Sequence, residues 1–273
     1  MKTIIIILPF LIKLSLAQHS ILVLEKQTNI PLYTVNVALL KKDIGTTTNE
    51  NGVALLNINK NDSILITLVG YIAIRGTIVN TNSDTFFLEK KIIANDNITV
   101  KAKKYINTKQ LGFTKGIAKD KLSLTGNGYT TAVFIENTEK LNGILKSVKL
   151  QLEVPKSKIN SSLRIRIFEA DESKTPQEEL TYENVLIKYS ELKRNTIIDL
   201  EKYNLPITKF GIFIGIELIS INDDIRPTIT LKCIRTNEND NNWSNFKDKK
   251  WVKYYPKNFE YISTPKISIK VKY

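Results

Sequence analysis

The sequence predicts an all-β protein, and three features of the chain carry this prediction. Ile, Thr, Val, Tyr and Phe are plentiful and Ala and Leu do not dominate, which favours strands because branched and aromatic side chains pack well on a pleated surface. Short apolar runs recur along the chain, and some alternate with polar residues at the period of a strand. Turn residues separate these runs, and Asn51-Gly52 before the apolar run 53–56 predicts a tight hairpin.

Length and charge set broad limits on the class of protein. The chain has 273 residues, of which 42% are apolar and 25% charged, as in an ordinary globular protein. The formal net charge of +13 raises the question of whether the protein binds nucleic acid. The lysines are scattered and often alternate with apolar residues, as in 266–270, so we interpret them as solvent faces of strands. The alternative is binding to an anionic polymer or a membrane surface.

The N-terminus carries a targeting signal. Met1-Lys2 is a positive start, Ile4–Ile12 is apolar apart from Pro9, and Ser15-Leu16-Ala17 offers small residues for cleavage. We therefore predict a signal peptide at residues 1–17 and a mature chain that begins at Gln18. The apolar stretch is shorter than the roughly 20 residues of a membrane span. Later segments are also too short, so the mature chain is predicted to lack a transmembrane segment and to be exported to the periplasm, the outer membrane surface or the medium.

The first part of the mature chain is predicted to form a small β-sandwich. Its markers occur in a fixed order: Pro31-Leu32, Val35 and Val37, Thr47-Thr48 followed by Gly52, and Gly70-Tyr71. This order resembles the carboxypeptidase regulatory-like domain, a transthyretin-like sandwich, over about residues 19–104. The resemblance implies a domain at 18–104 in an exported bacterial protein, with Gly52 and Gly70 as turn residues. It also implies an accessory domain, because the zinc-binding catalytic domain of those peptidases has no counterpart here.

Residues 105–125 are predicted to be a connector, and 126–273 a second β-domain. The connector is rich in Lys, contains Gly112 and Gly116, and shows little periodicity. About eight strands follow, which suggests a jelly-roll-like sandwich, and this half is similar to regions that accompany the regulatory-like domain in exported bacterial proteins. The run 162–168 alternates, which predicts one wet face, whereas 210–219 is nearly all apolar and is predicted to be a central strand. Residues 172–186 could hold one short helix. The predicted strands are 130–135, 143–154, 162–168, 185–189, 196–200, 210–219, 229–234 and 267–271.

The residues available for catalysis are few. His19 is the one histidine and lies at the predicted mature N-terminus, where we expect it to be mobile, so catalytic triads and histidine zinc sites are disfavoured. Cys233 is the one cysteine, and its strand-like surroundings predict a buried, inert thiol. The sequence contains neither a phosphate loop nor a dinucleotide fingerprint, and we predict no cofactor and no metal.

Carboxylates leave one enzymatic alternative open. Glu169, Asp171 and Glu172 follow a predicted strand, where a solvated loop is the favoured interpretation. Glu217 lies in an apolar run, so its side chain either faces water or has a shifted pKa, and we favour a structural role. A pair of carboxylates could perform glycoside hydrolysis, which makes a carboxylate-based hydrolase acting on glycans the alternative function.

The region 237–255 contains the candidate binding residues. Residues 237–242 are rich in oxygen ligands but lack the spacing of a calcium loop, which favours a plain polar loop. Aromatic residues follow closely and could stack on sugars, or could pack a long loop onto the sandwich. We predict an exported, non-catalytic binding or structural accessory protein of the bacterial envelope, whose partner is a glycan or an envelope protein and not nucleic acid. The predicted ligand-binding residues are Trp243, Trp251, Tyr254 and Tyr255.

Overall fold

Strands make up nearly all of the regular structure. The computed structural model describes residues 18–80, 82–91, 105–125, 128–153, 161–220, 228–236, 242–253 and 262–273. Within these ranges, two short 3-10 helices, η1 (Tyr189–Glu191) and η2 (Glu201–Tyr203), accompany the strands. The predicted all-β fold is confirmed. No helix of the described residues is long and apolar enough to cross a membrane. The predicted signal peptide, 1–17, lies outside the described residues.

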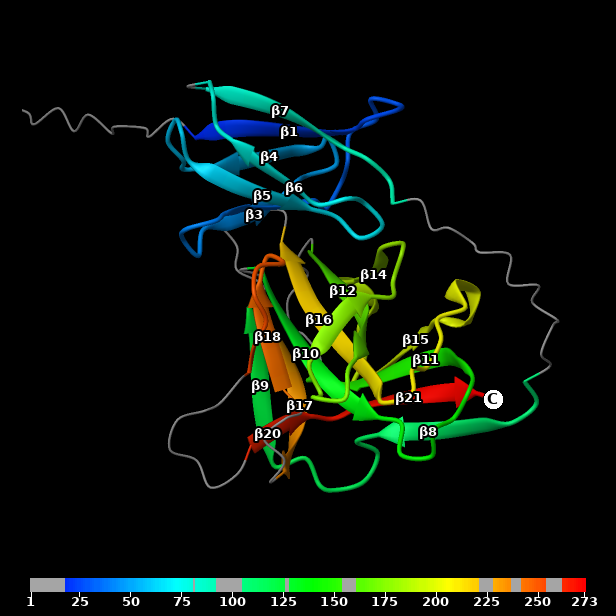
Figure 1. The fold of residues 1–273 in the computed structure, drawn as a ribbon. Helices are drawn as coiled ribbons and strands as arrows, with labels where there is room; N and C mark the ends of the chain where they lie inside the picture. Colours follow the sequence, from blue (N-terminus) through cyan, green and yellow to red (C-terminus); the bar gives the residue numbers. More distant parts are fainter. Residues whose placement is uncertain are drawn as a thin grey trace, which may run out of the picture.

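The N-terminal unit, residues 18–91, is a β-sandwich of two sheets (Figure 1, top). Alternate residues of both sheets point inward, and 13 buried apolar residues, Ile21, Val37 and Ile64 among them, form their shared core. The first sheet has the order β4 (Val53–Leu56), β1 (His19–Glu25), β7 (Ser83–Leu88), with β1 and β7 parallel. The second has the order β3 (Gly45–Thr47), β2 (Asn36–Leu39), β5 (Ser63–Thr67), β6 (Ile74–Thr77).

The turn predicted at Asn51-Gly52 is present, but the hairpin is not. Gly52 has a φ of 71°, and the Asn49 side chain accepts hydrogen bonds from the backbone nitrogens of Asn51 and Val53. The strands on either side, β3 and β4, belong to different sheets. The turn therefore carries the chain from one layer of the sandwich to the other. The sequence motif specified the local backbone geometry and did not specify the strand pairing.

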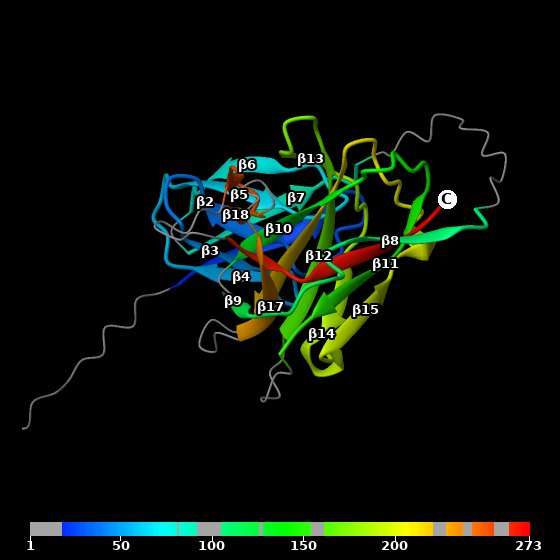
Figure 2. The ribbon, with the colours of Figure 1, turned by 90° about the horizontal axis from the view of Figure 1, so that it is seen from below.

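The C-terminal unit, residues 105–273, packs three sheets around a larger core. All three sheets contribute to its 28 buried apolar residues. Figure 2 shows the four-stranded sheet from below. The seven-stranded sheet has the order β13 (Pro176–Glu179), β12 (Ser161–Ala170), β16 (Gly211–Ser220), β10 (Tyr129–Glu136), β18 (Asn242–Phe246), β19 (Val252–Lys253), and β14 (Val185–Lys188) also pairs with β12. The four-stranded sheet has the order β15 (Asn195–Asp199), β11 (Ile144–Gln151), β21 (Ile267–Lys272), β8 (Thr108–Gly112). The three-stranded sheet has the order β20 (Ile262–Pro265), β17 (Thr228–Thr236), β9 (Asp120–Thr125).

Two segments differ from their predictions. The expected connector, 105–125, contributes β8 and β9, which bury Leu111 and Leu124 in the core of the C-terminal unit. Their partners are β21 and β17, more than 100 residues later in the chain, so no local pattern could reveal the pairing. The short helix expected within 172–186 is absent from this fully described segment. It contains β13, which pairs back onto β12, and the first residues of β14.

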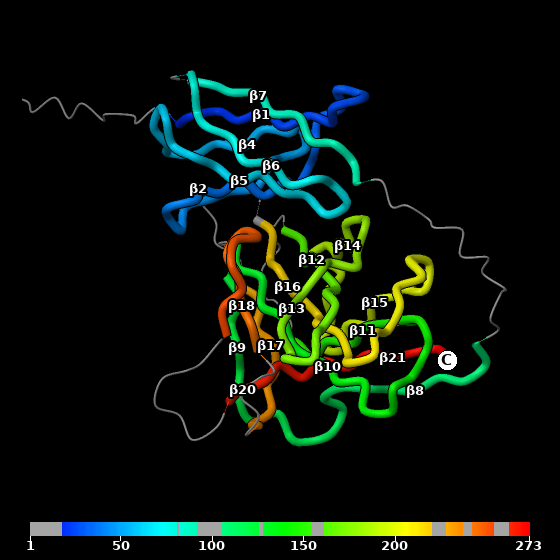
Figure 3. The backbone as a smooth tube through the Cα atoms, in the orientation of Figure 1, coloured from blue at the N-terminus to red at the C-terminus, as the bar shows by residue number. Residues whose placement is uncertain are grey.

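The two units meet at the outer face of the second N-terminal sheet. In Figure 1 and in the tube of Figure 3, β2, β3 and β5 lie above the ends of β12 and β16 and the turn that follows β18. The hydrogen bonds across this boundary join residues as far apart as Asn36 and Asp248. The apolar cores of the two units remain separate clusters. The boundary between them is therefore a polar interface.

Candidate interdomain site

Three polar side chains form a row across the N-terminal sheet. Asn36 on β2 lies opposite Thr47 on β3 and opposite Thr67 on β5. Its neighbours Val35 and Val37 are fully buried in the core, so by strand alternation Asn36 points out of the other face. All three side chains of the row are nonetheless buried, with at most 9% of their surface exposed. The C-terminal unit covers them.

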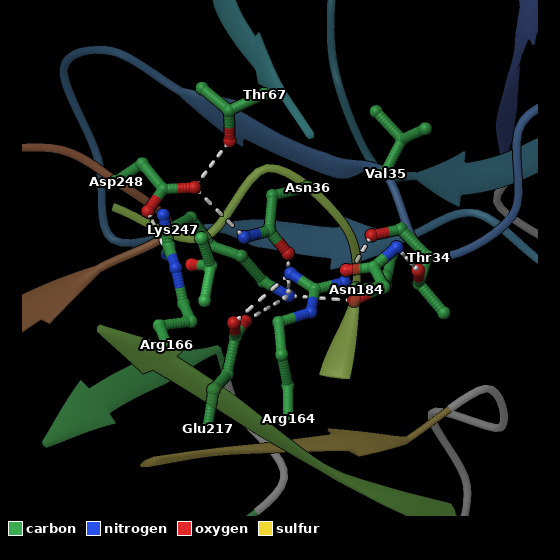
Figure 4. Close-up of polar contacts among 12 residues, drawn as sticks. Thr34, Val35, Asn36, Thr67, Arg164, Arg166, Asn184, Glu217, Lys247 and Asp248 are labelled. Atoms are coloured by element: carbon green, nitrogen blue, oxygen red, sulfur yellow. Dashed lines mark hydrogen bonds and ion pairs between the residues drawn. The ribbon is translucent and has the colours of Figure 1, made fainter. Parts of the chain in front are cut away.

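The turn after β18 inserts two charged side chains against this row (Figure 4). Lys247 Nζ donates to Thr47 Oγ1 over 2.7 Å and to Asn36 Oδ1 over 3.2 Å. Asp248 Oδ2 accepts from Asn36 Nδ2 at 3.0 Å and from the Thr67 hydroxyl. Asn36 therefore binds both charged residues of the turn. Its side-chain oxygen accepts from Lys247, and its side-chain nitrogen donates to Asp248.

The backbone of this turn is strained. Lys247 and Asp248 have φ values of 46° and 61°, in the left-handed region that costs a non-glycine residue about 1 kcal/mol or more. Thr34, also at the interface, has a φ of 61°, and positive φ is a genuine outlier for a β-branched residue. Strained backbone of this kind persists where the surrounding contacts over-determine it. Here those contacts come from the opposite unit.

Arg166 on β12 lies between two carboxylates. Its Nε and Nη2 donate to the two oxygens of Glu179 on β13, at 2.9 and 2.5 Å, and its Nη1 donates to Asp248. Burial alone would raise the pKa of Asp248, but the Arg166 charge and the hydrogen bonds from Thr67 and Asn36 outweigh it and hold that pKa well below its usual range. Burial likewise opposes the charge on Arg166, and its two anionic partners raise its pKa well above the ordinary value. Arg166 and Asp248 are therefore ionised.

Arg164, two residues earlier on the same face of β12, anchors a second ion pair. It lies directly opposite Glu217 on β16, and its Nη1 donates to Glu217 Oε2 over 3.1 Å. Its Nη2 donates to the backbone carbonyl oxygen of Thr34 in the N-terminal unit. Lys247 Nζ lies 3.9 Å from the other Glu217 oxygen. Arg164 and Glu217 are at most 1% exposed, so the face of β12 that we expected to be wet is covered by the N-terminal unit.

Gly70 provides the closest approach of the two backbones. Its φ is 81°, and a Cβ placed there would lie 2.2 Å from the Tyr182 carbonyl oxygen of the C-terminal unit. No side chain fits in that space. The Gly70-Tyr71 motif is therefore more than the turn that we expected, because its glycine allows the loop after β5 to contact the second unit.

A cleft of about 330 Å³ opens beside Arg166, between the two units. Glu179 and Asp248 line it together with Thr67, Tyr71 and Arg75. A pair of carboxylates in one cleft is what glycoside hydrolysis requires, with one of them protonated to act as the acid. Asp248 is held ionised, and both carboxylates are bound by Arg166. Their arrangement suits the joining of two units better than proton transfer.

The structure separates the four predicted ligand-binding residues. Trp243 is 8% exposed and packs edge-on against Phe213, with 6.5 Å between ring centroids. Trp251 is half-buried and meets Phe168 edge-on at 5.0 Å. Both tryptophans thus lie on one aromatic cluster on the face of the seven-stranded sheet that points away from the main core. Trp243 offers no open ring face for a sugar. Tyr254 and Tyr255 lie outside the described residues.

The remaining candidate residues have structural surroundings. His19 is 3% exposed and lies 2.8 Å from Asp84, so the expectation of a mobile histidine was wrong, because β1 begins there and pairs with β7. Cys233 is buried as predicted, and burial raises the pKa of its thiol to about 12. Asp171 accepts hydrogen bonds from Thr175, which lower its pKa and close the loop after β12.

Candidate metal ligands are dispersed over the described part of the chain. No group of three or more His, Cys, Asp or Glu side chains there could hold a metal ion. Most of the oxygen-rich stretch considered for calcium, residues 237–241, lies outside the described ranges. Asn242 at its end is buried, and its amide donates to Ser263 and Thr264.

The residues that join the units were not predicted from the sequence. Arg164 and Arg166 lie in the run that was expected to have a wet face, and Lys247, Asp248 and Asn36 were not among the predicted site residues. One signal was available. Six of the 40 basic residues are arginines, and two of these stand in the alternating run 162–168. Arginine is the cation preferred in buried, bidentate ion pairs, so an arginine pair in a lysine-rich chain indicates burial.

Comparison with known proteins adds little. No family model matches the chain, and no curated protein matches it. A solved structure of a protein of unknown function from Bacteroides fragilis NCTC 9343, considered a candidate for membrane association, shares 10% identity with it over 93% of this chain and 97% of that chain. The TM-score is 0.21, so this similarity carries no argument about fold or function.

Proposed function

We propose that the chain is an exported, non-catalytic binding or structural accessory protein of a bacterial envelope, in which two β-units are held in one relative orientation. The observation that supports this most is the use of charge at the interdomain site. Three cations, Arg164, Arg166 and Lys247, face three carboxylates, Glu179, Glu217 and Asp248, so the formal charges of this cluster balance. Such a cluster fixes the relative orientation of the units and leaves no group poised for chemistry.

Two features of the sequence support the rest of the proposal. The predicted signal peptide at 1–17 favours export. The resemblance of the N-terminal unit to the carboxypeptidase regulatory-like domain favours an accessory role, because that domain accompanies other functional parts in exported bacterial proteins. The ligand that we propose is a glycan or an envelope protein.

A glycan array with the mature chain, Gln18–Tyr273, tests the glycan form of the proposal. Trp251 is the aromatic residue to vary, since its ring is only half-buried. We expect a specific hit that Trp251→Ala abolishes while the circular dichroism spectrum is unchanged. A hit that persists in Trp251→Ala would place the glycan elsewhere. A blank array followed by no crosslinked partner in the envelope would contradict a binding role.

A hollow of about 540 Å³ keeps the hydrolase alternative open. Glu169, Asp171 and Glu178 line it, at the far end of β12 and on β13. The lowered pKa of Asp171 suits a base or nucleophile, which leaves a glutamate as the acid. Release of reducing sugar from a glycan library by the wild type, lost in Glu169→Gln with Glu178→Gln, would favour this alternative and overturn the non-catalytic proposal.

A further inference from the structure

A second polar hollow, of about 400 Å³, lies in the C-terminal unit away from the interdomain site. Gln151, Arg194, Asn195, Lys232, Lys266 and the loop 116–118 line it. Three of these residues are cations and two are carboxamides. None of the described residues that line it is acidic. The cations of this hollow therefore lack acidic neighbours among its lining residues, whereas every cation of the interdomain site faces a carboxylate.

Main-chain pairing assembles this hollow from distant parts of the chain. Gln151 at the end of β11 lies opposite Asn195 at the start of β15. The Leu152 amide donates to the Arg194 carbonyl at 2.9 Å, and the Lys266 amide donates to the Lys232 carbonyl at 2.7 Å. The ends of two sheets thus bring the cations together. Lys232 lies on β17, whereas Arg194 and Lys266 stand just outside strands, where these main-chain hydrogen bonds hold their backbones.

The cations of this hollow retain donors for a ligand. Within the described ranges, neither Arg194 nor Lys232 makes an ion pair, and the Lys266 ammonium donates to the Gly116 carbonyl at 2.8 Å, which uses one of its three hydrogens. Neighbouring carboxylates are engaged elsewhere, since Asp120 binds Arg235 and Glu153 binds Lys121. Like charges held close together repel unless an anion lies between them.

We propose that this hollow, referred to below as the basic hollow, binds a phosphate group. A single carboxylate would leave three cations only partly neutralised. A phosphate carries more charge and more acceptor oxygens, which matches one guanidinium fork, two ammonium groups and two amide donors. Ile117 at the rim is 79% exposed, so an apolar part of the ligand could continue from the phosphate. This proposal is independent of the non-catalytic function proposed above.

Isothermal titration calorimetry of the mature chain with inorganic phosphate tests the proposal. The variant is Arg194→Gln with Lys232→Gln, whose side chains reach solvent. The matched control is Lys41→Gln with Lys60→Gln, two exposed lysines of the N-terminal unit, which removes the same net charge. We expect saturable binding that weakens at least about tenfold in the variant and is unchanged in the control, since two charge-assisted hydrogen bonds are lost.

Absence of saturable phosphate binding by the wild type would overturn the proposal, as would equal weakening in both variants, which would indicate a general effect of net charge. Far-UV circular dichroism checks that both variants fold. A second pair of titrations identifies the source of the phosphate. Glucose 6-phosphate represents a soluble phosphorylated ligand, and phosphatidylglycerol vesicles, with phosphatidylcholine vesicles as control, represent a lipid headgroup. Binding of either that depends on Arg194 and Lys232 supports the proposal.

Discussion

At the scale of single residues, Glu217 shows what periodicity can and cannot predict. Its place in an apolar run correctly marked it as unusual, because a carboxylate there needs either water or a compensating charge. The compensating charges are Arg164 on the neighbouring strand and Lys247, 30 residues later. Strand alternation in the run 162–168 identified the face on which Arg164 lies. It could not show that a second unit covers that face, since the covering residues, Thr34 and Asn36, lie more than 100 residues away.

Glu217→Gln tests how much the buried charges depend on one another. The change leaves Arg164 and Lys247 buried without their shared anion, and we expect the free energy of unfolding to fall by about 3 kcal/mol. Urea denaturation measures it. Glu139→Gln is the matched control, because its ion pair with Lys109 is exposed, and a change below about 0.5 kcal/mol is expected. Equal effects of the two substitutions would contradict a buried network.

The stability that the interface provides depends on pH through the ionisation of Asp248. Its folded-state pKa is depressed, so its contribution to stability is complete above the unfolded-state pKa of about 3.9 and is lost as the pH falls toward the folded-state value. We expect the stability difference between the wild type and Asp248→Asn to be constant from about pH 7 to 5 and to shrink below about pH 4. Urea midpoints at several pH values measure it, and a difference that does not change down to about pH 2.5 would contradict the assignment.

At the scale of elements, the sequence located the long apolar strands, but it missed other strands and did not reveal strand partners. The missed strands include β13, β18, β19 and β20. The eight strands predicted in the C-terminal half all exist within a few residues of their expected ends, because apolar runs and turn residues are local signals. Strands β8 and β9 were taken for a connector, since each exposes at least half of its residues and buries one leucine. The turn at Lys247-Asp248 was also missed. Left-handed backbone is predicted from Gly and Asn and more weakly from Asp, and the Lys247 that begins this turn gives no such signal.

Gly70→Ala tests the contact between the loop after β5 and Tyr182. Alanine there meets both the strain of a φ of 81° and the Tyr182 carbonyl oxygen, so we expect a loss of at least about 2 kcal/mol in unfolding free energy. Gly116→Ala is the control. Its φ is 87°, but its nearest neighbour would be a side-chain carbon of Ile234 at 3.4 Å, so strain of about 1 kcal/mol is its main cost. Losses of the same size would show that the Tyr182 contact is unimportant.

At the scale of the whole molecule, the two units differ in their capacity to fold alone. The core of the N-terminal unit has 13 buried apolar residues against 28 in the C-terminal unit. A sandwich this small buries a limited fraction of its surface and is marginal by itself. We therefore expect the stability of the N-terminal unit to depend more on the interdomain site than that of the C-terminal unit does. The order of turn and strand motifs, with the family resemblance, indicated two β-domains, but a polar interface leaves no apolar pattern that could predict their docking.

Arg166→Met tests this dependence by hydrogen exchange. The change leaves Glu179 and Asp248 without their shared cation. We expect the amides of Ile21 and Ile64 to exchange about a hundredfold faster, while those of Ile214 and Ile269 change little. Arg235→Met removes a cation from an exposed pair and should leave both sets unchanged. Uniform acceleration in both units would show that they unfold as a single cooperative body.

The row Thr47, Asn36 and Thr67 has a consequence for how such a chain can evolve. An apolar interface can pack against any partner of suitable shape. This row binds a partner only if it places a cation beside Thr47 and an anion beside Thr67. A related N-terminal unit with the same fold but a different residue in place of Asn36 would take one buried hydrogen-bond partner from Lys247 and one from Asp248. Exchange of this unit between proteins is therefore disfavoured, and we expect the two halves of the chain to have been inherited together, with changes at Asn36 tied to changes at the turn.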